Sequence, residues 1–577
     1  MKALVILTFL ALAGASNVTI MSHWSGGFQG QACIPISKEL DGWKAHLKFS
    51  EDVERLEVWA ATATKLNGRE YLLVNKDYDA QQHVGTDLCF GFMGYGSGDV
   101  VPETTIYIEG MDGPYGDGGT SQQTTPVPHT NGGTPSKNYE DALAKSILFY
   151  DAQRSGKLPA NNPIKWRGDS AVNDCVPGGW YDAGDHVKFG LPLASSTTLL
   201  LWGFVSFKDG YVKAGQLDAM YDMIKWPLDY YLRGWNPQTK QLIAQVGDGN
   251  VDHKFWGRPE DMTMARPCQW ISATNKGSDI AGETAASLAL GAIAFKEKDP
   301  QYSAQLLTAA ESIYAFAKAN RGVFAGASQF YSSARDIDEL CEASMWLYRA
   351  TNNKQYLDEA KTYVEVAWGW ALSWEDKKVS CQLLLYEDTQ NSSYKDAVVG
   401  FLHGWLPGGS TVYTPCGLAW RDMWGANRYA GNTALYALLT AEAGISARTY
   451  RVWAIEQINY MLGDNKHAGG CFSFQIGYGS KYPLQPHHRA ASCPDRPAPC
   501  SHDQLNAPGP SPQVLVGALV GGPEASDLYD DLRTDYVHNE VATDYNSGFQ
   551  GALAGIVHLI LTDNFPATQN KCPCSAS

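Results

Sequence analysis

The stretch Tyr139–Gly156, "YEDALAKSILFYDAQRSG", decides the fold class of most of this chain of 577 residues. Its apolar residues recur at helical spacing and the run ends in glycine, a pattern typical of an amphipathic helix and its C-terminus. Few runs in this part of the chain alternate like strands. The same helical pattern returns in "PQYSAQLLTAAESIYAFAKANRG" (300–322), "DIDELCEASMWLYRATNN" (336–353), "KQYLDEAKTYVEVAWGWAL" (354–372) and "ARTYRVWAIEQINYMLGDN" (447–465).

Successive helices across short polar breaks predict one large helical domain over residues 138–566, followed by a tail over residues 567–577. No fixed-period repeat of the kind that solenoids show is present in the sequence, so the pattern favours a closed double ring of helices. The Gly/Pro-rich polar-aromatic stretches between helices are where functional residues are expected.

The first residues have the features of a secretory signal peptide over residues 1–15. Lys2 precedes the apolar run "ALVILTFLALAG", and Ala13-Gly14-Ala15 supply small residues for cleavage. The run is too short for a membrane span, and no later stretch is apolar for long enough. We therefore expect a secreted, extracellular protein with no membrane partner, whose 12 cysteines form disulfides rather than a zinc site.

Residues 16–112 predict a small all-β sandwich. The runs "WKAHLKFS" (43–50), "VERLEVWAATA" (53–63) and "REYLLVN" (69–75) are short, mix apolar with polar residues, and are separated by turn residues. Cys33 and Cys89 fall within this part and can close it as a disulfide-bonded module. The segment 113–137 is rich in Gly, Thr, Pro and Ser without apolar periodicity, which predicts a linker.

The composition limits the kind of ligand. A formal net charge of −16, from 45 basic and 61 acidic residues, argues against nucleic acid and anionic membranes as partners. The 18 Trp and 30 Tyr suit flat stacking surfaces, although packing in the core explains many of them equally well.

Three polar loops carry candidate chemistry. "GGWYDAGDHVKFG" (178–190) holds Asp182 and Asp185, "YPLQPHHRAASC" (482–493) holds His487 and Arg489, and "TDYVHNEVATDYNSGF" (534–549) holds Glu540. Two carboxylates this close can hold one water molecule between them if at least one is ionised. Glu540 precedes an apolar Val-Ala pair, and desolvation there would raise its pKa and make it a proton donor.

A carboxylate base with its water, opposite a protonated carboxylic acid, is the apparatus of glycoside hydrolysis. Each motif alone has a structural alternative, because Asp and Gly are ordinary turn residues and a His-His-Arg run is often a buried hydrogen-bonding cluster.

Together and in this order, the three motifs resemble glycoside hydrolase family nine, over residues 139–566. The resemblance implies an (α/α)6 barrel and a monomeric endo-β-1,4-glucanase that inverts the anomeric configuration and needs no cofactor for its chemistry. It implies cellulose or another β-1,4-glucan as substrate. By the same resemblance Asp185 is the general base, Asp182 helps to hold the nucleophilic water, and Glu540 is the general acid.

The resemblance also implies a set of sugar contacts along a cleft. Helix-face packing is the alternative for any one of the aromatic residues. The implied contacts are His487, Arg489, Tyr545, His253, Trp256, Tyr331, Trp374, Trp424 and Arg428.

The sequence departs from the family where the family often binds calcium, at a Ser-Gly…Asp-Glu stretch. This chain has Ser333-Ala334 there, with an extra residue before Asp338-Glu339. Backbone and carboxylate oxygens suit Ca²⁺, so Ser333, Asp338 and Glu339 are the candidate ligands of a calcium ion, which is structural if it is bound. The alternative is that this departure from the family pattern removes the site.

The N-terminal part resembles a family-two carbohydrate-binding module through "WSGGFQG", "VERLEVWAA", "VNKDYDAQ" and "LCFGFMGYG". By this resemblance Trp24, Trp59 and Tyr78 form a flat aromatic strip that binds crystalline polysaccharide, and Trp43 lies in the core. The alternative is a sandwich in which all of these aromatic residues are core residues.

Two other functions remain open on the sequence. One is hydrolysis of another β-glycan, such as mixed-linkage glucan, xylan or a chitin-like polymer. The other is a catalytically silent polysaccharide-binding protein, which has no need of Asp182, Asp185 and Glu540 together.

Overall fold

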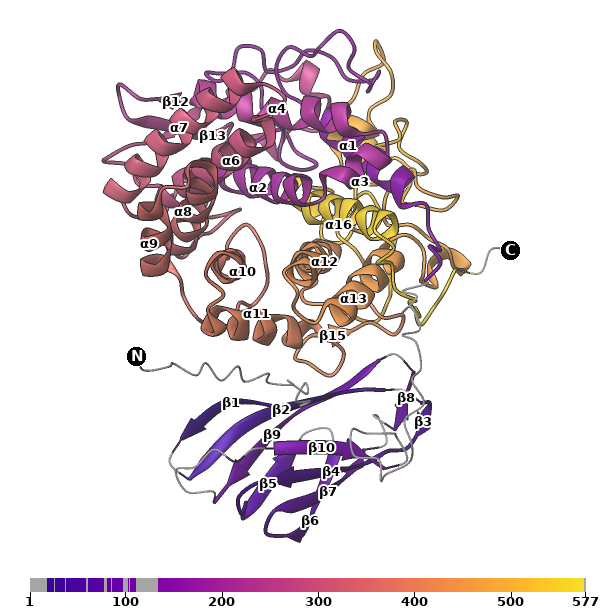
Figure 1. Cartoon of the computed structure of the whole chain (residues 1–577). Helices are drawn as coiled ribbons and strands as arrows, with labels where there is room; N and C mark the ends of the chain where they lie inside the picture. Colours follow the sequence, from indigo (N-terminus) through magenta and orange to yellow (C-terminus); the bar gives the residue numbers. More distant parts are fainter. Residues whose placement is uncertain are drawn as a thin grey trace, which may run out of the picture. The chain divides into compact units, whose positions relative to one another are not determined.

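The computed structural model describes residues 18–109, apart from residues 25, 37, 59–60, 77–79, 85, 97–101 and 103, and residues 133–574. The chain divides between residues 129 and 130 into two compact units, which are described separately below (Figure 1). The predicted signal peptide and most of the predicted linker lie outside the described residues. No helix in the described part of the chain is both long enough and apolar enough to span a membrane.

The described part of the N-terminal unit contains two four-stranded antiparallel sheets and one short strand pair. In spatial order the first sheet contains β1 (Val18–Trp24), β2 (Gly27–Pro35), β9 (Asp87–Tyr95) and β5 (Arg55–Val58). The second contains β10 (Thr104–Ile108), β4 (Lys44–Phe49), β7 (Glu70–Asn75) and β6 (Ala61–Asn67), and the short pair is β3 (Leu40–Asp41) with β8 (Gln81–Gln82).

The two sheets pack face to face around an aromatic core. Phe49 of β4 lies 5.7 Å, centroid to centroid, from the Phe28 ring of β2. Trp43 is buried and stacks on Phe90, as predicted for a core tryptophan. Cys33 and Cys89 are cross-strand partners joined by a disulfide. These contacts confirm the predicted disulfide-bonded β-sandwich.

The side chains of the predicted polysaccharide-binding strip are not among those that the structure describes. Trp59 and Tyr78 lie outside the described residues, and Trp24 ends β1 but its side chain is likewise outside the description.

The C-terminal unit is a double ring of helices, which confirms the predicted (α/α)6 barrel (Figure 1). The inner ring contains α2 (Gly190–Ser206), α6 (Ser278–Phe295), α8 (Ile337–Thr351), α10 (Lys378–Thr389), α12 (Ala426–Glu442) and α16 (Thr543–Leu561). The outer ring contains α1 (Tyr139–Ala152), α4 (Leu217–Gly234), α7 (Pro300–Ala319), α9 (Lys354–Tyr363), α11 (Ser392–Trp405) and α13 (Ala447–Met461).

The sequence of each helix explains its ring. The inner helices α2, α6 and α16 are apolar or small on nearly every side and almost entirely buried, as expected of helices enclosed by others. A Cβ atom on Gly203 would lie 2.7 Å from the Cα of Gly551, so the glycines allow the backbones of α2 and α16 to touch. The outer helices leave a polar face exposed.

Two predicted helices end earlier than their patterns indicate. α1 ends at Ala152 rather than Gly156, because Arg154 and Gly156 form isolated bridges with Trp180 and Ser170 beside the Asp182 loop. α9 ends at Tyr363, and the segment 364–372 leaves the helix. Apolar spacing alone does not reveal partners elsewhere in the chain that compete with the helix for these backbone groups.

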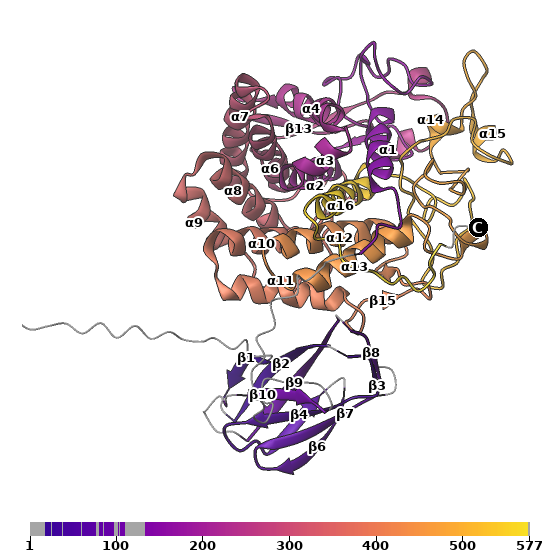
Figure 2. The same ribbon diagram turned by 45° about the vertical axis from the view of Figure 1, so that its right-hand side comes forward.

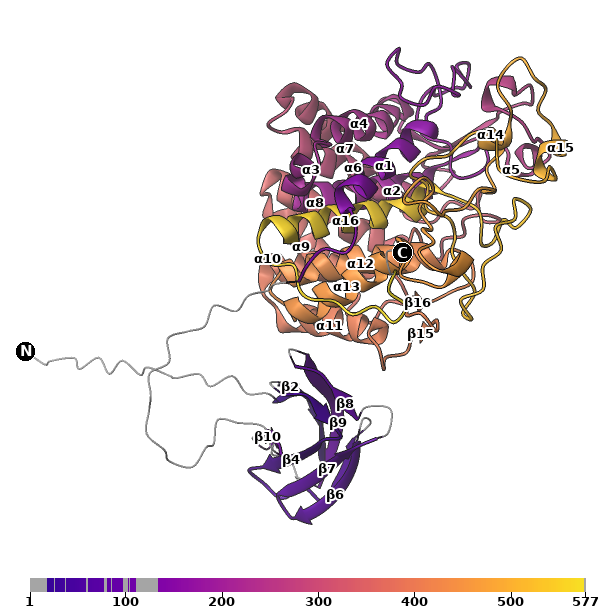
Figure 3. The same cartoon turned by 90° about the vertical axis from the view of Figure 1, so that its right-hand side faces the viewer.

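Because inner and outer helices alternate along the chain, the N-termini of the inner helices point to one end of the barrel. The long connections gather at this end, together with the short helices α5 (Gly249–Asp252), α14 (Arg489–Ser492) and α15 (His502–Leu505) (Figures 2 and 3). The other disulfides, all within this unit, join Cys175–Cys268, Cys341–Cys381, Cys416–Cys572, Cys471–Cys574 and Cys493–Cys500, so all 12 cysteines are paired.

Candidate active site

A cavity of about 730 Å³ opens at the N-terminal ends of the inner helices, within the size range of ligand-binding pockets. All of the residues that the sequence predicts for catalysis and sugar binding line it. They are Asp182, Asp185, Glu540, His487, Arg489, Tyr545, His253, Trp256, Tyr331, Trp374, Trp424 and Arg428.

A glycine brings the first two loops together. Gly184 stands between the two aspartates, its carbonyl oxygen accepts a hydrogen bond from the Arg489 amide at 3.1 Å, and a Cβ atom there would lie 2.1 Å from the His487 carbonyl oxygen. The Asp182 carbonyl oxygen accepts from the Thr543 amide at the start of α16, at 2.9 Å. The glycine of the Asp-x-Gly-Asp sequence is therefore required by the close approach of two chain segments.

Backbone pairing places Glu540 beside the second loop. Glu540 and His487 form a parallel bridge, and the His487 amide donates to the Asn539 carbonyl oxygen at 2.8 Å. The Glu540 carbonyl oxygen accepts from the Gly521 amide at 2.9 Å. These bonds leave its side chain on the cavity wall.

Asp182 and Asp185 are both buried and line the cavity. Asp182 accepts a hydrogen bond from the Tyr331 hydroxyl, and Asp185 lies 3.1 Å from Nε2 of His253. In each carboxyl group Oδ1 is buried and has no hydrogen-bond partner among the described residues. Burial, followed by the charge of Asp185, raises the pKa of Asp182. The pair therefore offers two acceptors and favours the ionisation of only one of them.

Glu540 is suited to hold a proton at neutral pH. Burial, followed by the charge of Asp185, raises its pKa to about 8, although the nearby Arg489 guanidinium opposes the shift. A carboxyl group that stays protonated at pH 7 can act as a general acid.

His487 presents a neutral imidazole to the cavity. Its Nδ1 lies 2.7 Å from the Arg533 carbonyl oxygen, which can only accept, so Nδ1 carries the proton and Nε2 is left as an acceptor. Burial lowers the pKa of His487 to about 4.

A buried carboxylate that sequence reasoning missed fixes Arg489, one of the sugar-binding candidates. Asp252 accepts from the Arg489 guanidinium at 3.0 Å and directly precedes His253, which offered a signal in the sequence. Asp185, Asp252 and His253 bring their ligand atoms within 4.8 Å of one another, so this group is also where a metal ion could bind.

Arg428 fixes the opposite wall through a buried ion pair. Its guanidinium lies 2.8 Å from Asp544 and 5.1 Å from the centre of the Tyr545 ring. Because Arg428 and Asp544 lie in the first turns of α12 and α16, this pair joins two inner helices at the cavity.

Further lining residues escaped the sequence analysis. Tyr536 could have been found from the sequence, since it lies four residues before Glu540. Its ring is exposed, and the ring centroid lies 5.6 Å from that of Trp424. The others carry no distinguishing pattern in the sequence. The additional lining side chains are Ala183, Phe189, Gln329, Phe330, His502, Leu505, Tyr536 and Ala542.

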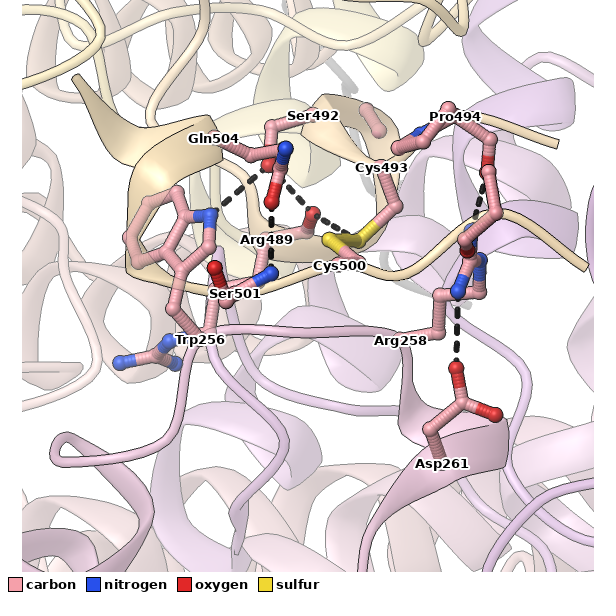
Figure 4. Close-up of a disulfide and its surroundings, with 12 residues drawn as sticks. Trp256, Arg258, Asp261, Arg489, Ser492, Cys493, Pro494, Cys500, Ser501 and Gln504 are labelled. Carbon is pink, nitrogen blue, oxygen red and sulfur yellow. Dashed lines mark hydrogen bonds and ion pairs between the residues drawn. A yellow bond between two sulfur atoms is a disulfide. The ribbon is translucent and has the colours of Figure 1, made fainter. Parts of the chain in front are cut away.

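A disulfide-tied loop (Figure 4) directly precedes α15, which carries two of these residues, His502 and Leu505. Cys493 and Cys500 are joined, and the Arg258 guanidinium donates to the carbonyl oxygens of Pro494 and Ala498. The loop leads from α14, which carries Arg489, to α15, and so extends the wall of the cavity.

The predicted calcium-binding residues are not among those that line this cavity. The Ser333 hydroxyl donates to the Arg335 carbonyl oxygen, Asp338 accepts from the Lys377 amide at 2.8 Å, and Glu339 lies 3.1 Å from the Lys377 ammonium. Asp338 Oδ1 and Glu339 Oε2 are buried without a hydrogen-bond partner among the described residues.

Comparison with known proteins assigns both units. Residues 139–553 match the model of glycosyl hydrolase family 9, and residues 14–112 match a cellulose binding domain. The chain is 42% identical to endoglucanase A of Bacillus pumilus over 464 residues, which are 76% of this chain and 68% of that protein. It is 43% identical to endoglucanase B of Cellulomonas fimi over 456 residues, which are 73% of this chain but only 42% of that protein.

Among solved structures, an endoglucanase from the termite Nasutitermes takasagoensis matches with a TM-score of 0.71 and 47% identity, covering 74% of this chain and 100% of that one. The family model begins at the first residue of α1, ends within α16 and includes all three polar loops. The chain belongs to glycosyl hydrolase family 9.

Proposed function

We propose that this protein is a secreted, monomeric endo-β-1,4-glucanase that hydrolyses internal bonds of cellulose and related β-glucans with inversion. The observation that carries the proposal is one cavity lined by Asp182, Asp185 and a Glu540 whose pKa is raised to about 8. This combination supplies a water-binding base and a proton donor in one site. The related endoglucanases support the choice of substrate.

In the proposed reaction Glu540 gives its proton to the glycosidic oxygen as the bond to the anomeric carbon breaks. Asp185 takes a proton from a water molecule, whose oxygen forms the new bond to that carbon from the opposite face. Asp182, held by the Tyr331 hydroxyl, accepts the second hydrogen of this water and fixes its position. Both proton transfers use carboxyl groups, so no cofactor takes part.

We propose that the N-terminal module, residues 16–112, binds insoluble glucan, and that residues 1–15 direct secretion. The match to a cellulose binding domain supports the first assignment. The linker, residues 113–137, then keeps the catalytic domain, residues 138–566, close to the polymer and raises the effective substrate concentration. Trp24, Trp59 and Tyr78 are the proposed contact residues.

The proposal is tested by reducing-end release from carboxymethylcellulose, alongside mixed-linkage glucan, xylan and chitin oligomers. We expect release from carboxymethylcellulose at pH 5–7 with a rapid loss of viscosity, because internal cuts shorten chains quickly. Preferred cleavage of another polymer in the panel would identify a different β-glycan hydrolase. Binding to cellulose powder without release from any polymer would identify a silent binding protein.

We also propose a structural calcium ion held by Ser333, Asp338 and Glu339. The buried carboxylates of Glu283 and Glu339 both form ion pairs with the Lys377 ammonium, whereas the buried Asp338 carboxylate accepts from the Lys377 backbone amide. Burial raises the pKa of Glu339. An excess of buried carboxylates favours a further cation, and their oxygens suit Ca²⁺.

Chelation should therefore destabilise the protein. We expect EGTA to lower the melting temperature by a few degrees and Ca²⁺, but not Mg²⁺, to restore it, since a bound ion at about 100 times its Kd contributes roughly 2.7 kcal/mol. An Asp338→Asn variant should melt at the same temperature with and without EGTA. A wild-type melting temperature that EGTA does not change would exclude the proposed calcium site.

A further inference from the structure

Two tryptophans outside the cavity are unusually exposed. Trp368 is 68% exposed and Trp370 is 48% exposed, in the segment between α9 and α10. Large aromatic side chains left in water usually mark a binding surface when they lie together and beside a known site. Neither residue lines the cavity.

The segment that carries them is fixed rather than loose. The buried side-chain amide of Gln382, on the inner helix α10, donates to the carbonyl oxygens of Glu365 and Ala367 at 2.6 and 2.7 Å. A Cβ atom on Gly400 of α11 would lie 2.1 Å from Nε1 of Trp368. The glycine thus leaves room for the indole to lie against the helix backbone.

Trp370 is connected to the cavity wall through a chain of side chains. Its ring lies 5.2 Å from the Tyr429 ring and 4.9 Å from the Arg421 guanidinium. The Tyr429 ring lies 4.3 Å from the guanidinium of Arg428, which lines the cavity. Trp370 is therefore held from two sides and lies one side chain beyond the wall.

We propose that Trp368 and Trp370 form an outer binding surface for the part of a β-1,4-glucan chain that extends beyond the cavity. The inference rests on the proposed function. A pyranose ring presents a flat face of C–H groups, which packs on an exposed indole. Because the glucan chain is uncharged, it needs no charged residue at the surface that binds it. Continuity with the cavity through Tyr429 and Arg428 selects the substrate as the occupant.

The test compares Trp368→Ala, Trp370→Ala and the double variant, in the full chain, on carboxymethylcellulose and on cellotetraose. A chain of four sugars is short enough for the cavity, whereas the polymer reaches the outer surface. We expect the ratio of kcat/KM on polymer to kcat/KM on cellotetraose to fall about three- to tenfold in the double variant, the effect of one or two aromatic contacts. Val212→Ala, which removes an exposed apolar side chain on α3 (Lys208–Lys213), should leave the ratio unchanged.

A second measurement needs no turnover and so separates this surface from the catalytic proposal. The measurement is the oxidation of Trp368 and Trp370 by N-bromosuccinimide in the Glu540→Gln variant, followed by peptide mass spectrometry. Excess polymer should slow this oxidation, and cellotetraose should not. An unchanged polymer-to-tetraose ratio, or oxidation at the same rate with and without polymer, would overturn the proposal. Failure of wild-type hydrolysis with protection intact would instead reject only the proposed activity.

Discussion

Replacing Glu540 with glutamine should reduce turnover of unactivated β-1,4-glucan by about 10²–10⁴-fold, the usual contribution of a general acid. The glycosidic oxygen would then leave without a proton, whereas glutamine keeps the shape of the side chain and its hydrogen bonding in the cavity. Binding of cellotetraose should remain within about threefold of wild type. Initial rates and calorimetric binding measure the two effects.

The pH profile ties this loss to one proton. In wild type, activity should fall as pH rises through about 8, because Glu540 then loses the proton that burial and Asp185 have retained. The residual activity of the Glu540→Gln variant should show no such fall as pH rises through about 8. Near-wild-type turnover by the variant would refute the role of Glu540 as the acid.

Folding stability distinguishes a catalytic loss from a damaged fold. The pKa of Glu540 is raised from 4.5 to about 8, so its stabilising contribution is complete below pH 4.5 and is lost as pH rises towards about 8. Glutamine does not titrate, and the variant should melt at pH 7 at the wild-type temperature or above it. Glu297→Gln, at a side chain 87% exposed, is the matched control.

Replacing Asp185 with asparagine should be comparably severe, with a loss of about 10²–10⁴-fold, because no group then takes the proton of the attacking water. Asp182→Asn should cost less if Asp182 only positions that water. The Asp185 charge also raises the pKa of Glu540, so the alkaline limb of any residual Asp185→Asn activity should shift to lower pH. Steady-state rates from pH 4 to 10 measure both.

The comparison of the two aspartates also tests their assignment. A larger loss in Asp182→Asn than in Asp185→Asn would exchange the two roles. Each variant removes a charge from the same buried pair and keeps the side-chain size, so each serves as a control for the other.

The helical ring was predictable because its signal is local. Five helical runs could be read from apolar spacing, and Asn138, which caps α1 by accepting from the Asp141 amide, lies where the pattern places the start of the helix. The early ends of α1 and α9 were not predictable, because they depend on Trp180, Ser170 and Gln382, which lie elsewhere in the sequence.

The cavity was predictable only through the order of three motifs. Spacing alone could not show that Asp182 and Glu540 line the same cavity, since that depends on backbone pairing with residues 184 and 487. His502 and Leu505 were invisible because a disulfide-tied loop brings them to the cavity. Asp252 was missed because its only signal in the sequence was its position directly before His253.

The anomeric form of the first product tests the central claim most directly. If Asp185 delivers water from the face opposite to the departing oxygen while Glu540 protonates it, the sugar released with a new reducing end begins as the α-anomer. Proton NMR during the first minutes of cellotetraose hydrolysis, before mutarotation, should show the α-signal rising first. An initial β-product would contradict single displacement and, with it, the assigned roles of these carboxyl groups.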